Sequence, residues 1–537
     1  MSSPNNQYQR LRTVGEKAFP ALVFLSGLVY FCLRILGFGL EYIPGDLGDS
    51  RFINFLLEHG HQWLNGNEAS FWSPGFMHPF KNFIALSDNM IGSLPLYSVW
   101  RFAGFEMETA YQLWWLTVCT LNYWICYIVL RKWNQSVLLA AVLAWLFAFS
   151  LFNLGQLNYM QMIVRFMVPV AFYAAFRMID TPSRKYFLLY LFAIAAQLYM
   201  VMYTGIYVFY FSLLFIVVYG FLAKKFTNIR FYFRKQQLLF TGTASLVFLL
   251  LIALLFLPYH EMSKTVGLRL YREVAQNLPA LHSFLLPHEG SVPWRFLSVS
   301  MKTGLSEYWL HYLFPGLILF ATLIASPLYL LYARYKRIQV TPEIKALLLC
   351  IFLIALVHVN WGNGISLYAA IFKLPGINSI RVPIRFMHAE LFLLLLALAF
   401  FLRKLRPMLV LAFFLLVFAD NSFTAEKIPR TQKKDLVARR EKLRNIIVAQ
   451  NSSGKKIVAV TDTSQAAYIT HIDAMIAAQS LGLKTINGYS SYCHDSFDIF
   501  FTRCNNQGLD KWLDYANLSR TDVLVIDRNK KQLLITD

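Results

Sequence analysis

Long apolar runs alternate with short polar segments over the first 420 residues of the chain. A helix needs about 20 largely apolar residues to cross a bilayer. The pattern predicts eleven membrane-spanning helices, over 19–40, 109–130, 136–152, 161–179, 186–203, 205–222, 238–258, 309–332, 344–361, 386–402 and 407–418. The first run is too long for a removable signal peptide and no small-residue cleavage site follows it, which favours a retained span.

A further, moderately apolar segment covers 89–105 and is interrupted by Pro95 and Arg101. We expect an interfacial or re-entrant helix there rather than a full span. A crossing at this point would also break the alternation of sides that the eleven spans require.

The pattern changes after residue 420. Strand-like and helix-like segments alternate, in the order helix 433–451, strand 456–461, helix 466–481, strand 484–488, helix 497–517 and strand 523–527. Such alternation is typical of an α/β domain. The predicted fold class is therefore an α-helical polytopic membrane protein with a small C-terminal α/β soluble domain.

Composition supports this class. Of the 537 residues, 57% are hydrophobic and only 15% are charged, and the mean hydropathy is +0.47, which excludes a soluble globular protein of this size. The formal net charge of +21 does not indicate a nucleic-acid partner, because the basic residues are spread between the apolar runs rather than gathered in one arm or stripe.

The basic residues instead predict the topology. Five clusters fall on the same predicted side as the N-terminus: 131–132, 177–185, 224–235, 334–337 and 403–406. Loops rich in Lys and Arg remain in the cytoplasm. We therefore expect a cytoplasmic N-terminus at 1–18, a membrane domain at 19–420 with outer loops 41–108, 259–308 and 362–385, and an extracytoplasmic domain at 421–537.

Two of the six cysteines, Cys493 and Cys504, lie outside the predicted spans, in the extracytoplasmic domain. Disulfides persist in oxidising compartments, so a bond between this pair is one prediction. Two free thiols are the other, because spacing alone does not establish the geometry of a disulfide.

The first outer loop gathers ionisable residues directly after the first span. Asp46 and Asp49 lie on a glycine-containing turn, and a helix along the bilayer surface is predicted from Arg51 onward. Ionisable groups at membrane depth tend to be functional. The alternative is that the carboxylates only complement the positive end of the helix dipole.

Further candidates for substrate contacts in this loop are Arg51, His59, His61 and Asp88. The histidines are two positions apart, which points them in different directions on a helix, so they predict no shared metal site. Ordinary interface positions are the alternative for both. In the second outer loop, Glu307 is the best single candidate for a substrate contact.

Arg381 and Arg385 precede the predicted span at 386–402. Guanidinium groups bind two phosphate oxygens at once, so this pair predicts a phosphate site. Arginines at the ends of spans also serve as interface anchors, which is the alternative. Arg165 is charged although it lies inside a predicted span, and we interpret it as part of a cavity for a lipid donor.

These residues carry a resemblance. Gly45-Asp46 followed by Arg51, just after the first span, resembles the first-loop signature of the GT-C glycosyltransferases, and four further stretches are similar to uncharacterised bacterial members: 58–59, 87–88, 381–386 and 486–490. Only the first-loop motif is tied to mechanism in that superfamily.

The resemblance implies an inverting transfer of a sugar from a polyprenyl-phosphate donor to a hydroxyl of a glycan, lipid or protein acceptor, at the outer face of a bacterial inner membrane. Asp46 matches the position of the general base, with Asp49 as second candidate. The leaving phosphate needs neighbouring cations, and Arg381 and Arg385 are the candidates for stabilising the charge that it gains. The sequence requires no cofactor and leaves a divalent metal open.

Two other function classes remain. A transporter or flippase would concentrate charges near the middle of the bilayer, often in repeated halves, whereas the carboxylates here cluster in loops. A non-catalytic membrane assembly protein would keep the architecture without the chemistry. The C-terminal domain either binds the acceptor or caps the catalytic cavity.

Overall fold

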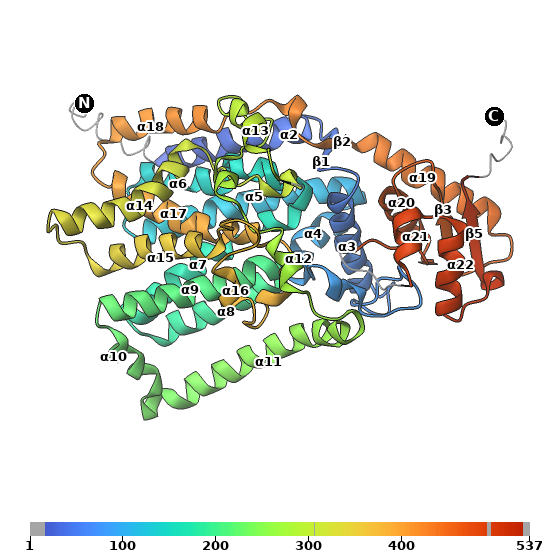
Figure 1. Cartoon of the computed structure of the whole chain (residues 1–537), viewed down its shortest axis with the longest axis horizontal. Coiled ribbons are helices and arrows are strands. Elements are labelled where there is room, and N and C mark those ends of the chain that lie inside the picture. Colours follow the sequence, from blue (N-terminus) through green and yellow to red (C-terminus); the bar gives the residue numbers. More distant parts are fainter. Residues whose placement is uncertain (1–16, 306, 491–495, 530–537) are drawn as a thin grey trace, which may run out of the picture.

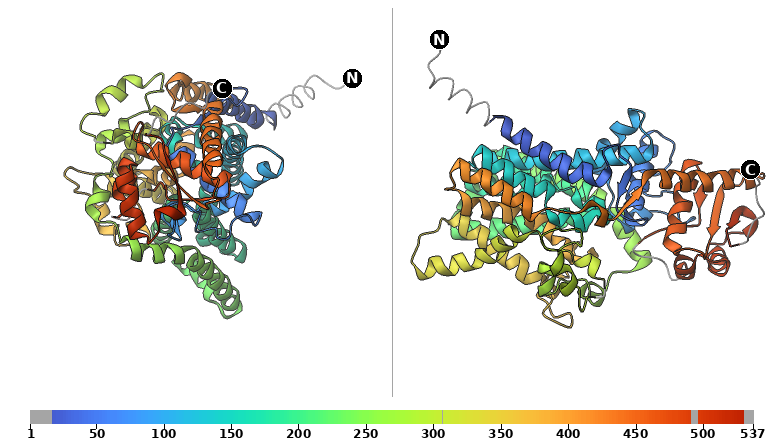
Figure 2. Two further views of the ribbon diagram at one scale, coloured as in Figure 1. Left: turned by 90° about the vertical axis from the view of Figure 1, so that its right-hand side faces the viewer. Right: turned by 90° about the horizontal axis from the view of Figure 1, so that it is seen from above.

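The computed structural model describes residues 17–305, 307–490 and 496–529. A bundle of helices that lie side by side forms most of the molecule, and the C-terminal α/β domain covers one end of the bundle (Figure 1 and Figure 2). The first helix, Lys17–Leu36, passes through a π-helical turn and ends in α2.

The remaining helices up to residue 420 are α3 (Asp49–Leu64), α4 (Leu94–Phe102), α5 (Met107–Lys132), α6 (Val137–Phe149), the 3-10 segment η4 (Leu151–Ile163), α7 (Met167–Asp180), α8 (Arg184–Met200), α9 (Met202–Leu222), α10 (Phe226–Ile229), α11 (Lys235–Val266), α12 (Tyr271–Ala275), α13 (Arg295–Met301), α14 (Leu317–Tyr335), α15 (Pro342–His358), α16 (Tyr368–Ile371), α17 (Met387–Leu402) and α18 (Pro407–Asp420).

Within the described residues, six helices are long and apolar enough to cross a membrane: Lys17–Leu36, Met107–Lys132, Met202–Leu222, Lys235–Val266, Leu317–Tyr335 and Pro383–Leu402. Helix α6 and η4, bent by 49°, make a seventh if they are taken as one span. These helices identify an integral membrane protein. Each of the eleven predicted ranges contains a helix, but α7, α8, α15 and α18 are shorter than a full span, so the number eleven stays a prediction.

The predicted span at 309–332 is wrong at its start, because α14 begins only at Leu317. The preceding Gly316 has φ +97°, and the carboxylate of Asp420 accepts hydrogen bonds from the backbone N–H groups of Leu317 and Ile318, at 2.8 and 3.1 Å. A carboxylate on these free N–H groups stabilises a helix start. Asp420 lies at the end of α18, so a distant helix sets this boundary.

The first outer loop contains α4 and α3, two helices for which the sequence made predictions. The segment 89–105 contains only the nine-residue helix α4, which is too short to cross a bilayer. Helix α3 was predicted to lie along the bilayer surface, but every residue from Ser50 to His61 is buried. It runs across the end of the bundle, between the bundle and the C-terminal domain (Figure 1).

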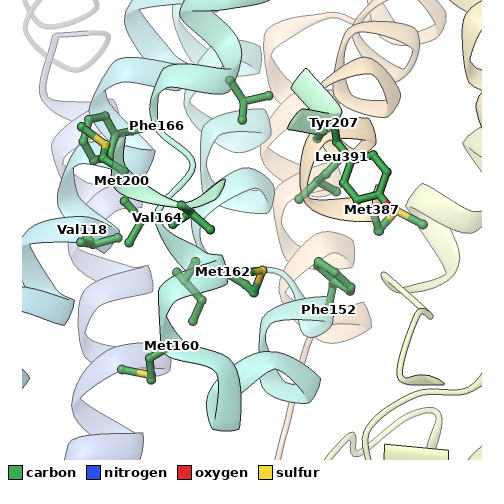
Figure 3. Close-up of a cluster of buried hydrophobic side chains, with 14 of the residues drawn as sticks. Val118, Phe152, Met160, Met162, Val164, Phe166, Met200, Tyr207, Met387 and Leu391 are labelled. Atoms are coloured by element: carbon green, nitrogen blue, oxygen red, sulfur yellow. The ribbon is translucent and has the colours of Figure 1, made fainter. Parts of the chain in front are cut away.

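The core of the bundle is continuous and rich in large side chains. Trp114, Trp115 and Trp145 are completely buried, and Figure 3 shows Met160 and Met162 of η4, Met200 of α8 and Met387 of α17 among the buried side chains around the break between η4 and α7. Methionine fills irregular spaces well, which suits a region where the backbone is not regular helix.

Helix α11 is the exception to this close packing. It is 32 residues long, and only 11% of its most apolar window is buried. Figure 1 shows it at the edge of the bundle, and it contacts α8, where Arg184 donates to Gln237 Oε1 at 2.7 Å and the hydroxyl of Tyr199 donates to the carbonyl of Leu251 at 2.8 Å. Near the end of α11, the hydroxyl of Tyr259 donates to the carbonyl of Ser87 at 2.9 Å.

The C-terminal domain follows the predicted alternation. It contains α19 (Lys433–Gln450), β3 (Ile457–Thr461), α20 (Ala467–Ser480), β4 (Lys484–Thr485), α21 (Asp498–Arg503), α22 (Asn506–Tyr515) and β5 (Val523–Asp527), and its parallel sheet has the order β4-β3-β5. The small parallel α/β fold is confirmed. Cys493 lies outside the described residues, so the predicted disulfide stays a prediction; Cys504 is buried.

A second, two-stranded sheet joins distant parts of the chain. Strand β1 (Tyr42–Pro44), directly after the first helix, pairs antiparallel with β2 (Arg430–Gln432), which precedes α19. The backbone N–H of Gly45 also donates to the carbonyl of Pro429 at 2.8 Å. The start of the first outer loop is therefore attached to the linker that leads into the C-terminal domain.

Candidate active site

A cavity of about 500 Å³ lies where the bundle meets the C-terminal domain. Its wall comes from α3, the first outer loop near Asp88, η4, the end of α11, the segment 378–385 and the C-terminal domain. Five of the predicted site residues line it: Asp49, Asp88, Glu307, Arg381 and Arg385. The structure thus brings carboxylates and arginines from four parts of the chain to one hollow.

Asp49 is the first residue of α3, and its carboxylate faces this cavity. The hydroxyl of Tyr489, from the loop after β4, donates to its Oδ1 at 2.9 Å. Burial raises the pKa of Asp49, while the Tyr489 hydrogen bond and the charges of Arg385 and Arg381 lower it. Burial outweighs these effects, and a carboxylate whose pKa is raised accepts a proton more readily than one in water.

Arg385 lies between two aromatic rings. Its guanidinium carbon is 4.6 Å from the ring centroid of Tyr159 and 5.0 Å from that of Tyr203. Rings on a guanidinium hold it by cation–π attraction and fix its plane. Arg385 also lines the cavity. Of the two arginines singled out in the sequence, it is therefore the one that provides an immobilised cation there.

Arg381 lies at the more open part of the wall. Its guanidinium is 3.9 Å from the carboxylate of Glu307, and both side chains are about 40% exposed, at 37% and 41%. Exposed ion pairs of this kind contribute little stability. Arg381 is therefore free to exchange its partner for an anionic ligand at small cost.

Asp88 lies deeper. Its Oδ1 accepts a hydrogen bond from the backbone N–H of Met202, at 2.9 Å, and it is 5% exposed. Burial raises the pKa of Asp88, and Arg385 and the Met202 hydrogen bond lower it. Asp88 thus fixes the start of α9 against the first loop and faces the same arginine as Asp49.

Asp46, the first candidate for the base, is exposed and is not among the residues that line the cavity. Its Oδ1 accepts from the backbone N–H of Gly48 at 2.9 Å, and its own N–H donates to Asn158 Oδ1 at 3.2 Å. Burial of part of the group raises the pKa of Asp46. Its negative charge also raises the pKa of Asp49, so the two carboxylates are neighbours, with Asp49 on the cavity side.

Arg165 is fully buried away from the cavity, in the break between η4 and α7. It donates to the carbonyl of Phe147 at 2.5 Å and to Asn153 Oδ1 at 2.8 Å, and lies 3.0 Å from His388 Nδ1. Phe147 is near the carboxyl end of α6, where a cation interacts well with the helix dipole. The structure gives Arg165 contacts that hold the bend, and none with the cavity.

Arg51, His59 and His61 also lie outside the lining. Arg51 binds Asp473 of α20 at 2.7 Å, with both side chains under 5% exposed. His59 Nε2 is 2.8 Å from the carbonyl of Phe71, and burial lowers its pKa to about 4. His61 Nε2 contacts the amide of Asn65 at 3.0 Å. Arg51 and His59 join α3 to its surroundings, whereas His61 contacts the residue that caps the end of α3.

Sequence reasoning missed the tyrosines of the site. Tyr159 and Tyr203 hold Arg385, and Tyr489 binds Asp49. A tyrosine in a membrane helix has many ordinary roles, so only the spatial approach to a charged partner distinguishes these. For Tyr489 one signal existed, since polar residues just after a strand of a parallel sheet lie at the edge where ligands bind.

No group of three or more His, Cys, Asp or Glu side chains is arranged to hold a metal ion in the ranges described here. The carboxylates of the cavity are instead accompanied by arginines.

The fold and the cavity define a polytopic helical membrane protein with a charged site under an α/β domain. Its structure is similar to the Archaeoglobus fulgidus oligosaccharyltransferase determined in complex with Zn and sulfate, with a TM-score of 0.51 and 14% identity over 93% of this chain and 67% of that chain. The same enzyme, AglB, in complex with an inhibitory peptide and a dolichol-phosphate gives 0.51 and 12% over 94% and 69%.

The mycobacterial arabinofuranosyltransferase AftD gives a TM-score of 0.49 and 12% identity over 84% of this chain, which spans only 30% of that enzyme. No protein-family model and no curated protein sequence matches this chain. The structure has the fold of the GT-C glycosyltransferases, and the resemblance seen in the sequence is confirmed at the level of the fold.

Proposed function

We propose that the protein is a membrane glycosyltransferase that moves a sugar, with inversion, from a polyprenyl-phosphate donor to a hydroxyl acceptor at the extracytoplasmic face. The observation that carries the proposal is the meeting of Asp49 and Arg385 at one cavity. A base and an immobilised cation are the two groups that this reaction needs from the protein.

In this reaction the acceptor hydroxyl attacks the anomeric carbon of the donor sugar. Its proton passes to the carboxylate of Asp49, and the bond between the sugar and the phosphate breaks on the opposite face. The phosphate oxygen gains the charge that the bond releases. Arg385 stabilises this charge, because its planar donors match two phosphate oxygens, and Arg381 adds a second cation at the mouth.

The wall of the cavity supports a donor that arrives from the membrane. Met262 and Val266 at the end of α11 line it, and α11 is the least buried of the six helices that are long and apolar enough to cross a membrane. The archaeal enzyme of the same fold was determined with a dolichol-phosphate, a phosphate on a lipid. We place the lipid of the donor beside α11 and the acceptor on the side of the C-terminal domain.

We propose Asp49 rather than Asp46 as the base, because Asp49 lines the cavity and Asp46 does not. Two variants separate them. Asp49→Asn is expected to lower kcat about 100- to 10,000-fold, the usual contribution of a general base. Asp46→Asn is expected to change kcat less than about tenfold, through its effect on the neighbouring carboxylate.

The assay measures release of polyprenyl phosphate and formation of glycosylated product by purified protein, with a panel of polyprenyl-phosphate hexoses and pentoses and an envelope extract as acceptor. Asp510→Asn is the control, since Asp510 is an exposed partner of Arg520 in the C-terminal domain. A transporter would move intact donor across proteoliposomes without product, and an assembly protein would do neither; either result contradicts the proposal.

A further inference from the structure

We infer that Tyr489 of the C-terminal domain is a positioning residue of the active site, which fixes the carboxylate of Asp49 by its hydrogen bond and makes that domain part of the catalytic unit. The inference rests on the proposed function and deepens it. The residues that meet are 440 positions apart in the sequence, and the bond between them is 2.9 Å long.

The first support is how firmly the ring of Tyr489 is held. It packs edge-to-face on Phe52 of α3, with 5.3 Å between ring centroids, and it lines the cavity together with Ser490. Burial, followed by the charge of Asp49, raises the pKa of Tyr489, so its hydroxyl stays protonated and acts as the donor. The carboxylate of Asp49 then has one oxygen occupied.

The second support is the loop that carries Tyr489. Backbone hydrogen bonds connect it to the first outer loop: Thr485 N–H to Gly75 O at 2.8 Å, His78 N–H to Thr485 O at 3.0 Å, and Met77 N–H to Asn487 O at 3.1 Å. The side chain of Asn487 binds both the N–H and the carbonyl of Val460 in β3, at 2.7 and 2.9 Å. The loop cannot move apart from the sheet or the first loop.

The third support is a buried ion pair of α3, made by the residue two positions after Asp49. Asp49 and Arg51 lie in the first turn of α3, and Arg51 binds Asp473 of α20. Asp473 also accepts from Arg439 of α19 at 2.5 Å. The C-terminal domain is therefore bound to α3 by a buried ion pair and, on the cavity side, by the hydrogen bond of the Tyr489 hydroxyl.

Several charged and titratable groups face Asp49 from the surrounding elements, and any change in its titration is measured against them: Asp46, Tyr111, Tyr159, Arg381, Arg385 and Tyr489. Among these, Tyr489 is the hydrogen-bond donor to its side chain. A hydrogen bond to the ionised form lowers a carboxylate pKa. Its removal therefore makes the base titrate at higher pH.

The test is Tyr489→Phe, assayed for kcat/KM across pH with polyprenyl-phosphate sugars. The limb on the acid side should move up by about one pH unit, the shift expected for one lost hydrogen bond to a charged group. Activity below that limb should fall about tenfold. KM for the donor should change little, because Arg385 is untouched.

Tyr468→Phe is the matched control. Its ring packs against that of Tyr489, with 6.4 Å between centroids, and it loses a hydroxyl that does not bind Asp49. Its pH profile should equal that of the wild type. An unchanged profile for Tyr489→Phe, in a preparation where Asp49→Asn is inactive, overturns the inference and leaves the proposed function standing.

If the protein accepts none of the donors tested, a measurement that needs no turnover still tests the positioning role of Tyr489 separately from the proposed function. The infrared band of the protonated Asp49 carboxyl is identified by its loss in Asp49→Asn, and its titration midpoint is compared in Tyr489→Phe and Tyr468→Phe. A higher midpoint in Tyr489→Phe alone supports the positioning role. Equal midpoints in the two variants overturn it, whatever the activity.

Discussion

Arg385 is the residue whose surroundings are most specialised. A guanidinium between two rings keeps its plane fixed, and its edges remain for a ligand. An ammonium group has the same charge but neither a plane nor a fork of donors. The rings of Tyr159 and Tyr203 therefore select the shape of the cation as well as its charge.

We predict that Arg385→Lys binds the donor poorly although the charge is kept. Loss of the bidentate contact should raise KM for the polyprenyl-phosphate sugar at least about tenfold, as about 1.4 kcal/mol corresponds to a factor of ten. Steady-state kinetics at saturating acceptor measure this. Arg381→Lys, at the exposed mouth, should change KM far less; equal effects of the two variants contradict the special role of the rings.

At this scale, five of the ten site residues predicted from the sequence line the cavity. Asp49, Asp88, Glu307, Arg381 and Arg385 line the cavity, because ionisable residues in outer loops of a membrane protein are seldom placed there without partners. Their roles stay predictions. Arg165 is also an ionisable residue at membrane depth, but it lies outside the cavity. It donates to the carbonyl of Phe147 near the end of α6, and a carbonyl there is available only because the helix breaks.

Among the elements, the turn before α3 controls the site. Gly45 has φ +91°, and a Cβ there would lie 2.5 Å from Cβ of Ser50 and 2.9 Å from the carbonyl of Leu157. Both neighbours are fixed, because the Ser50 hydroxyl binds the carbonyl of Pro44 at 2.5 Å. Only glycine allows the chain to leave β1 and enter α3 with Asp49 at the first position.

We predict that Gly45→Ala displaces the start of α3 and lowers kcat more than about tenfold, while the protein loses about 1–3 kcal/mol of stability, the usual range for a strained backbone position. Thermal unfolding in detergent and the transfer assay measure the two effects. Gly66→Ala is the matched control, since Gly66 also has positive φ but has open space around it. Equal loss of activity in both would contradict the argument.

Elements that depend on local pattern were predicted well, and those that depend on distant partners were not. The alternation of strands and helices after residue 456 is a local pattern, and the structure follows it. The start of α14 is set by Asp420 of α18, and α3 is buried by contacts with η4, α4 and α5 of the bundle as well as with α20 of the C-terminal domain. None of these contacts leaves a signal in the segment that it changes.

At the scale of the whole molecule, the contact between the two domains has a buried ion pair at its centre. Arg51 and Asp473 are 4% and 3% exposed. Removing one partner of a buried pair is costly, because the other charge is left without compensation. Here Arg439 remains to compensate Asp473, so loss of Arg51 weakens the docking of the domain more than the fold of the domain itself.

We predict that Arg51→Met makes hydrogen exchange faster at the face of α20 that contacts α3, by about tenfold or more, while α5 keeps its protection. This change in exchange rate corresponds to the lower end of the free energies that hydrogen bonds to charged groups contribute. Arg439→Met is the matched control, because it removes a contact to the same carboxylate from within the C-terminal domain. Exchange at that face should then stay close to wild type.

The pairing of β1 with β2 has a consequence for biosynthesis. Pro44 of β1 and its partner Arg430 of β2 are 386 positions apart in the chain. The ribosome has therefore made all the helices up to α18 before β1, which leads to Asp46 and Asp49, can pair with β2. The tyrosine that holds the base is translated later still. Under the proposed function, the catalytic groups are therefore brought together only when translation has nearly ended, and donor lipid in the surrounding bilayer is not turned over before then.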